Sequence, residues 1–139
     1  MSSKQVSFFV AAVLLVPTAA SAAHGKVGLW SSTTFMATPG MPPQSHSTTY
    51  CMTAADVSSD APRTRAGSAC TFQNIAVTGH TISADMTCKG GLGATGHLTS
   101  TYDRDTHFSS TVSMNYQGRI ITNHVEGNWL KVDCAGAQN

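Results

Sequence analysis

The sequence predicts an all-β domain with about eight antiparallel strands in meander order, forming a strongly curled sheet or an open barrel with two disulfides. Two segments carry this prediction, because apolar and polar residues alternate over 70–88 and again over 107–125. A third observation is that no segment after the apolar start has the length and periodicity of a helix able to cover a sheet face. Such a sheet is expected to curl over its own core.

The hairpin CTFQNIAVTGHTISADMTC begins with Cys70 and ends with Cys88. A three-residue turn over 78–80 places the two cysteines opposite each other, on the same apolar face as Phe72 and Met86. This position is within disulfide range. A zinc site or a redox couple would favour a CxxC pair, and the chain has none. We therefore predict a structural disulfide.

The chain has four cysteines, which allow three pairings. If Cys70 bonds Cys88, elimination leaves Cys51 bonded to Cys134. The second bond would tie an early strand to the last part of the domain. Such bonds suit a small chain with a limited core.

Further strands are expected on both sides of this hairpin. Thr53 and Asp56 have the spacing of a helix cap, so a turn or two of helix is expected after the second strand. Gln117 and Gly118 suit a two-residue hairpin turn, and Gly127 is expected to end the strand that follows it. The other expected strands cover residues 27–36, 45–52, 95–102, 107–116 and 129–134.

The first 22 residues have the features of a signal peptide. Lys4 precedes an eleven-residue stretch, Val6–Val16, that is apolar except for one serine, and Ala20 and Ala22 stand where signal peptidase requires small residues. The alternative is a retained anchor, but a membrane-spanning helix needs roughly 20 apolar residues. We predict cleavage of residues 1–22 and a single exported domain, 23–139, in the periplasm or secreted, without a transmembrane segment.

The predicted mature domain has balanced charge, because removal of Lys4 leaves seven Lys and Arg against seven Asp and Glu. Nucleic acids select clustered basic residues, so they are not expected as partners. The same balance argues against binding to an anionic membrane surface. The partner stays unknown, with an apolar small ligand as the candidate.

The sequence identifies no catalytic residue, metal site or cofactor, and we predict that the protein is not an enzyme. It contains no GxSxG motif, and its single glutamate, Glu126, has no neighbouring acid with which to form a carboxylate pair. Four of its histidines fall in a turn or on polar strand faces, where exposed surface positions are expected: His80, His97, His107 and His124.

One histidine suggests an alternative function. His24 lies at the predicted cleavage boundary, and cleavage after Ala23 would give an N-terminal histidine able to chelate copper. Methionines such as Met36, Met41 and Met52 could add soft ligands for Cu(I), although filling of core and loops explains them more simply. A periplasmic copper-binding protein is therefore the alternative hypothesis.

Several motifs together resemble the bacterial domain of unknown function 3617 (DUF3617) family. They are GLW near the mature start, YCMTAAD, the cysteine-bounded hairpin, a glycine-rich segment, and a final W-x-x-x-x-C. Two features depart from the family pattern: Ala55 and Asp56 stand where glutamate is common, and residues 131–133 replace a glycine before the last cysteine. The resemblance implies a small exported or lipid-anchored protein of Gram-negative bacteria and transfers no mechanism.

The main functional hypothesis is an exported, non-enzymatic binding or structural module for a hydrophobic ligand or an envelope partner. One side of the predicted sheet is apolar and could line a cavity for a hydrophobic ligand or form a solid core. A protein that acts through its surface alone is the competing hypothesis. The residues of the apolar face are Phe72, Met86, Phe108, Val112, Met114, Ile121 and Val125.

Overall fold

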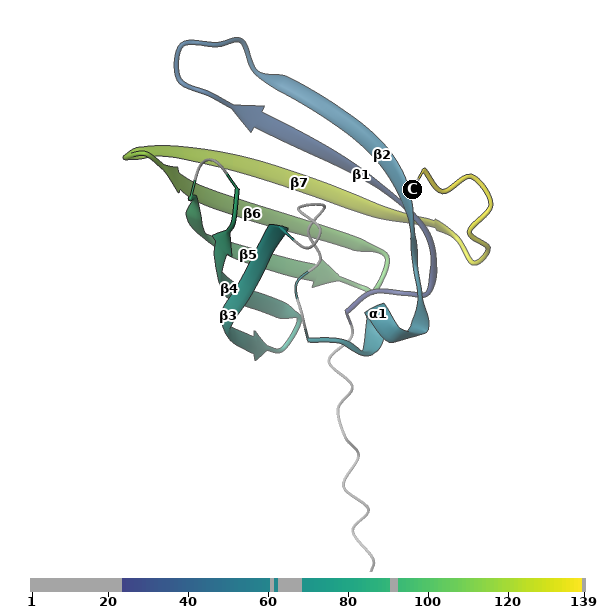
Figure 1. Cartoon of the computed structure of the whole chain (residues 1–139). Coiled ribbons are helices and arrows are strands. Elements are labelled where there is room, and N and C mark those ends of the chain that lie inside the picture. Colours follow the sequence, from purple (N-terminus) through teal and green to yellow (C-terminus); the bar gives the residue numbers. More distant parts are fainter. Residues whose placement is uncertain (1–23, 61, 63–68, 91–92, 139) are drawn as a thin grey trace, which may run out of the picture.

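A computed structural model describes residues 24–60, 62, 69–90 and 93–138 of the chain. In this part, seven antiparallel strands form one curled sheet in the order β2-β1-β7-β6-β5-β4-β3 (Figure 1). The sheet is not closed, because β2 and β3 lie at its two edges. The predicted all-β fold is confirmed. The strands are β1 (Gly28–Ala37), β2 (Gln44–Met52), β3 (Cys70–Thr78), β4 (Thr81–Cys88), β5 (Thr95–Asp103), β6 (His107–Tyr116) and β7 (Arg119–Lys131).

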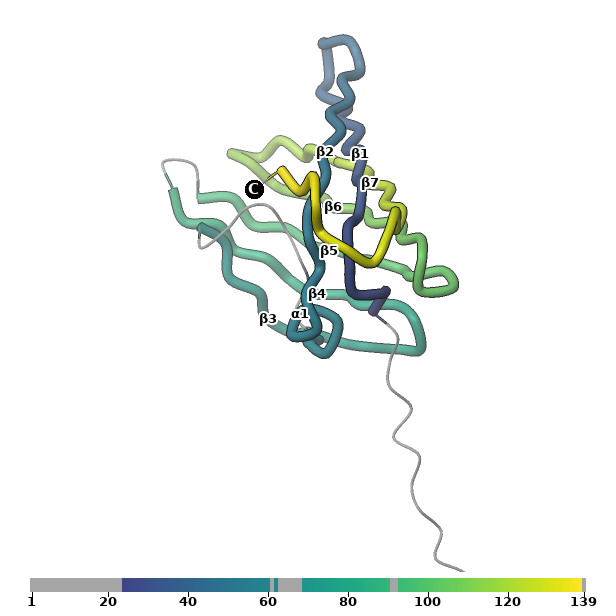
Figure 2. Tube along the Cα trace, turned by 90° about the vertical axis from the view of Figure 1, so that its right-hand side faces the viewer, coloured from purple at the N-terminus to yellow at the C-terminus, as the bar shows by residue number. Residues whose placement is uncertain are grey.

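The chain runs as a meander from β3 to β7, and β1 then pairs with β7 on the free side of that meander. The hairpin of β1 and β2 projects beyond the neighbouring strands (Figures 1 and 2). β2 and β3 lie at opposite edges of the sheet and are joined by the segment 53–69. This segment contains the short helix α1 (Ala54–Ser58).

The helix α1 begins at the capping box that the sequence predicts. Thr53 Oγ1 accepts a hydrogen bond from the backbone N–H of Asp56, and the backbone N–H of Thr53 donates to Asp56 Oδ2 at 2.7 Å. A helix of five residues is too short to be stable by itself. Its Val57 packs against a cluster of buried aromatic residues, so tertiary contact holds it in place.

The hairpin of β3 and β4 has the predicted register at its open end and a different one at its turn. Cys70 pairs with Cys88 and Phe72 pairs with Met86, as expected. A bulge follows, with Asn74 in the left-handed region at φ 51°, and beyond it the register is shifted by one residue. The turn therefore has two residues rather than the predicted three, and Val77, not Ala76, lies opposite Ile82.

The hairpin of β6 and β7 has the predicted register, with Met114 opposite Ile121 and Ser110 opposite Val125. The predicted strand end at Gly127 is wrong, because β7 continues through this residue to Lys131. Seven strands are therefore observed in the described residues where the sequence suggested about eight. Gly127 has a packing role instead, since a Cβ atom there would overlap the ring of Phe108 on the neighbouring strand.

A cluster of buried aromatic side chains lies at the α1 end of the sheet. Trp30 and Met52 are almost fully buried, and Trp30 donates a hydrogen bond from Nε1 to the backbone oxygen of Lys26 at 2.8 Å. The ring of Phe108 lies 5.8 Å from that of Trp30 and 5.6 Å from that of Tyr102, measured between centroids. These contacts form a compact aromatic cluster that fixes one end of the concave face.

The predicted signal peptide, residues 1–22, lies outside the described residues. Within the described part of the chain, no helix is long and apolar enough to cross a membrane.

Candidate functional site: a cavity on the concave face

The concave face of the sheet encloses a cavity of about 680 Å³. This volume lies in the range of small-molecule sites, which is about 300–1,000 Å³. Asp56, Ser59 and Pro62 of the β2–β3 connection help to line it, so these residues cover part of the concave face. The lining residues come from every strand, from this connection and from the segment before β1: His24, Ser32, Thr34, Tyr50, Asp56, Ser59, Pro62, Cys70, Phe72, Ile82, Met86, Cys88, Leu98, Ser100, Tyr102, Phe108, Ser110, Val112, Met114, Asn123 and Val125.

The apolar face that the sequence predicts becomes the wall of this cavity. Six of its seven residues line it, and Ile121 is the exception. Phe108 has a second role, because it also belongs to the aromatic cluster at the α1 end. The concave face is therefore solid at that end and hollow along the strands beyond it.

Two serines lie near the middle of the cavity wall, on adjacent strands. Ser100 on β5 and Ser110 on β6 face each other, and their hydroxyl oxygens are 2.6 Å apart. Both residues are buried, so the hydroxyls satisfy one another rather than water. Serine is much smaller than leucine or phenylalanine, and two serines here leave space where a solid core would hold larger side chains.

Asn123 on β7 places an amide group in the same wall. Its Oδ1 atom is buried and has no hydrogen-bond partner within the described structure. Its cross-strand neighbours are Val112 on β6 and Met36 on β1, both apolar. An unpaired buried carbonyl oxygen is uncommon in native proteins, because it loses water without gaining a protein partner.

His24 lies at the α1 end of the cavity, where its side chain is only 4% exposed. Its Nε2 is 2.9 Å from Asp60 Oδ1, and its ring centroid is 6.3 Å from that of Tyr102. Its Nδ1 is buried and has no partner in the described part of the chain. The sequence singled out His24 as a copper ligand, and its place in the cavity wall could not be read from the sequence.

His97, His107 and His124 lie outside the cavity on the convex face, as predicted for polar strand faces. Nδ1 of His97 is 2.9 Å from Asp85 Oδ1, and the Asn74 side chain donates to the other oxygen of this carboxylate. Hydrogen bonds from Asn74 and then from His97 lower the pKa of Asp85.

Glu126 forms a second polar cluster on the convex face, between two histidines. His107 Nε2 is 2.8 Å from one of its carboxylate oxygens, and His124 Nε2 contacts the other. Desolvation alone would raise the pKa of Glu126, but the hydrogen bonds from His124 and His107 outweigh it, so that the pKa is lowered. These histidines are thus half-buried and paired rather than freely solvated.

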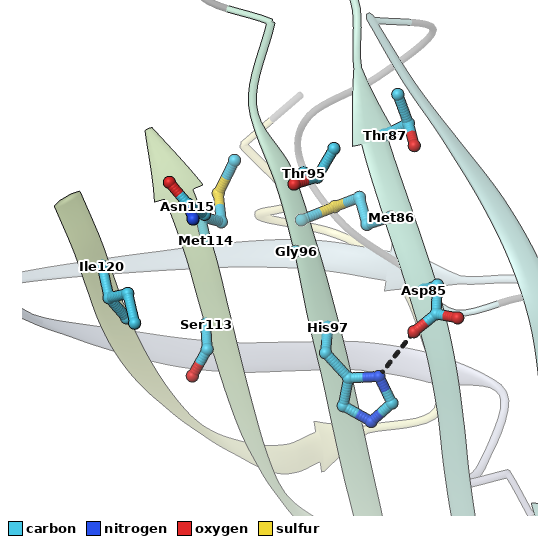
Figure 3. A pocket seen from close by; sticks show the side chains of 10 residues that line it. All are labelled: Asp85, Met86, Thr87, Thr95, Gly96, His97, Ser113, Met114, Asn115 and Ile120. Carbon is cyan, nitrogen blue, oxygen red and sulfur yellow. Dashed lines mark hydrogen bonds and ion pairs between the residues drawn. The ribbon is translucent and has the colours of Figure 1, made fainter. Parts of the chain in front are cut away.

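A second and more open hollow of about 390 Å³ lies across β4, β5, β6 and the start of β7 (Figure 3). Gly96 separates two methionines in a cross-strand row, Met86 on β4 and Met114 on β6. Both methionines also line the main cavity. The hydrogen bond between Asp85 and His97 lies beside this hollow (Figure 3).

The four cysteines are paired as the sequence suggests. Disulfides join Cys70 to Cys88 and Cys51 to Cys134. Cys70 and Cys88 also line the cavity. Among the residues that the structure describes, no group of three or more histidines, cysteines and acids is placed to hold a metal ion.

Comparison of the sequence with curated proteins and comparison of the fold with solved structures gave no match. Comparison with protein families matches residues 25–134 to the family described as "Protein of unknown function (DUF3617)". The matched segment covers all seven strands and both disulfides of the domain. The chain therefore belongs to the DUF3617 family.

Proposed function

We propose that the domain is a non-enzymatic binding module that holds an apolar small molecule in the cavity of its concave face. The observation that carries this proposal is the cavity of about 680 Å³ walled by Phe72, Met86, Val112, Met114 and other apolar side chains. Transfer of apolar ligand surface from water to such a wall supplies the driving force for binding. The neighbouring aromatic cluster fixes one end of the cavity, so that the site is largely preformed.

The proposed place of action is an oxidising compartment outside the cytoplasm, the periplasm or the medium. The two disulfides support it, because such bonds persist mainly in exported proteins. N-terminal sequencing of protein isolated from the periplasm tests the export. We expect a start at residue 23, within one residue, and an intact Met1 would contradict both the signal peptide and the export.

Copper binding through His24 has less support. The ring is buried against Tyr102 and already contacts Asp60, so it is held within the domain rather than presented at its surface. Titration of the processed protein with Cu(II), with its N-terminus verified by intact mass, tests this alternative. Stoichiometric binding that is lost in His24→Phe would favour copper over the apolar ligand.

The cavity is tested with a neutral apolar fluorophore, N-phenyl-1-naphthylamine, and two variants of neighbouring residues. Val112 lines the cavity, whereas Thr111 is exposed on the convex face of the same strand. Filling the cavity with Val112→Phe should weaken fluorophore binding at least about tenfold, because the ring takes the volume that the ligand needs. Thr111→Phe adds a ring on the opposite face and should leave the affinity unchanged.

Two results would count against the binding module. Folded wild-type protein without saturable fluorophore binding would favour a protein that acts through its surface alone. Equal affinity in wild type and Val112→Phe would place the fluorophore elsewhere on the domain. If neither result is obtained, mass spectrometry of small molecules that co-purify with the protein from the native periplasm identifies the physiological ligand.

A further inference from the structure

Asn123 is an anomaly in the wall of the cavity. On its own strand the flanking residues of the same face are Ile121 and Val125, and across the strands it faces Val112 and Met36. The amide thus interrupts a row of apolar side chains, and its Oδ1 is buried without a partner in the described structure. A valine or leucine would fit the surrounding pattern better, so packing does not explain an asparagine here.

The chemistry of the amide oxygen restricts what can pair with it. A side-chain amide oxygen only accepts hydrogen bonds, and it does not change its protonation state near neutral pH. Ser100 and Ser110 bond each other, whereas His24 contacts Asp60 through Nε2 and leaves its own buried Nδ1 without a partner in the described structure. Asn123 Oδ1 and His24 Nδ1 are therefore the two buried wall atoms without a partner there, and Asn123 is the one that does not lie at the α1 end.

We propose that Asn123 is a ligand-binding residue, and that the cavity takes an elongated amphiphile whose hydroxyl or amine group donates a hydrogen bond to Asn123 Oδ1. The apolar body of the ligand lies along the strands toward Phe108, which is opposite Gly127 on β7. Gly127 is four positions along the strand from Asn123, which corresponds to about 13 Å at ~3.3 Å per residue. This inference rests on the proposed binding function and adds the chemical class of the ligand.

A pair of probes tests the donor requirement directly. 1-Decanol is an extended chain of similar length with one hydroxyl donor, and 1-methoxydecane has the same chain without the donor. Their affinities are measured on the full mature protein by displacement of N-phenyl-1-naphthylamine. Wild type should bind the alcohol about tenfold more tightly, because the ether oxygen would face Asn123 Oδ1 with no hydrogen between them.

Two variants locate the preference. Asn123→Leu keeps the size of the side chain and removes the acceptor, so it should bind the two probes within about twofold of each other while its affinity for the ether is retained. Asn128→Leu is the matched control, because Asn128 lies on the same strand and is exposed. It should keep the wild-type preference.

A third measurement needs no ligand. Removal of an unpaired buried oxygen should leave the melting temperature of the empty protein unchanged or higher in Asn123→Leu. A lower melting temperature would mean that the amide is already satisfied in the empty protein, and would overturn the inference. So would equal wild-type affinities for alcohol and ether, or a preference that persists in Asn123→Leu. Failure of wild type to bind the fluorophore or either probe would instead remove the proposed function itself.

Discussion

Replacement of Gly127 by alanine should destabilise the domain, although the same change in an ordinary strand is favourable by about 0.5–1 kcal/mol. Gly127 is buried, and its backbone is not in the left-handed region, so conformation alone would allow alanine. The obstacle is the ring of Phe108, which lies where the new Cβ would stand. That ring is only 8% exposed and packs against Trp30 and Tyr102, so it cannot swing aside freely.

The expected cost of Gly127→Ala is that of overpacking a core, about 1–3 kcal/mol. For a domain of this size each kilocalorie corresponds to about 4 °C, so the melting temperature should fall by about 4–12 °C. Urea and thermal unfolding followed by circular dichroism measure both quantities on the mature protein. Asn128→Ala is the control, because this neighbouring residue is exposed and should change the stability by less than about 0.5 kcal/mol.

A double-mutant cycle shows whether the cost comes from the contact with Phe108. Phe108→Leu is itself destabilising, but it removes the ring that the new methyl group would meet. In that background Gly127→Ala should cost less than half as much as in wild type, which gives a coupling energy of about 0.5–2 kcal/mol. A stable Gly127→Ala protein, or a cost that is unchanged by Phe108→Leu, would refute the packing argument.

Two further predictions concern stability. Removing the disulfide Cys51–Cys134 by paired serine substitutions should cost about 4.5 kcal/mol of stability, and removing Cys70–Cys88 about 3 kcal/mol. The difference arises because the two bonds close loops with sequence separations of 83 and 18. Urea unfolding measures both costs, and a larger cost for Cys70–Cys88 would contradict the loop-length argument. Because the pKa of Glu126 is lowered in the folded state, its carboxylate contributes to the free energy of unfolding above about pH 4.5. This contribution is lost as the pH falls through the folded-state pKa. The difference in free energy of unfolding between wild type and Glu126→Gln should therefore shrink as the pH falls below about 4.5. A difference that stays constant with pH would show that the ionised carboxylate does not stabilise the fold.

The alternation of apolar and polar residues was sufficient to predict much of the fold. A period of two fixes which side chains share a face, and a one-residue slip would move the whole apolar set to solvent. This explains why Met114 opposite Ile121 and Phe72 opposite Met86 were predicted correctly. The disulfide between Cys70 and Cys88 follows from the same register.

The errors came from residues whose role depends on tertiary contacts. Asn74 enters the left-handed region and donates to Asp85 at 2.7 Å, and this bulge shifts the register of the hairpin. Nothing in the local alternation marks it, because Asn74 and Ile75 continue a plausible strand. The sequence predicts a strand end at Gly127, because glycine often interrupts a strand. Its actual role depends on the ring of Phe108, which is 19 positions earlier in the sequence.

The cavity could not be predicted from the sequence, because the same alternation describes a solid core and a hollow wall. The difference lies in the size and polarity of a few residues in the middle of the concave face. Ser100 and Ser110 face each other there, and Ala84, opposite Leu98 on the next strand, is also small and buried. Asn123 and His24 add polar groups that only the assembled sheet brings to one space.

The two disulfides and the cavity are best understood together. A hollow concave face buries less apolar surface than a solid core, and a domain of this length has little to spare. The disulfides lie at the two edges of the open sheet, since Cys51 is in β2 and Cys70 is in β3. Each bond constrains the unfolded chain and holds an edge strand to another part of the domain. Covalent bonds at the edges thus offset the apolar contacts that are missing at the centre, which allows the sheet to stay curled around an open space.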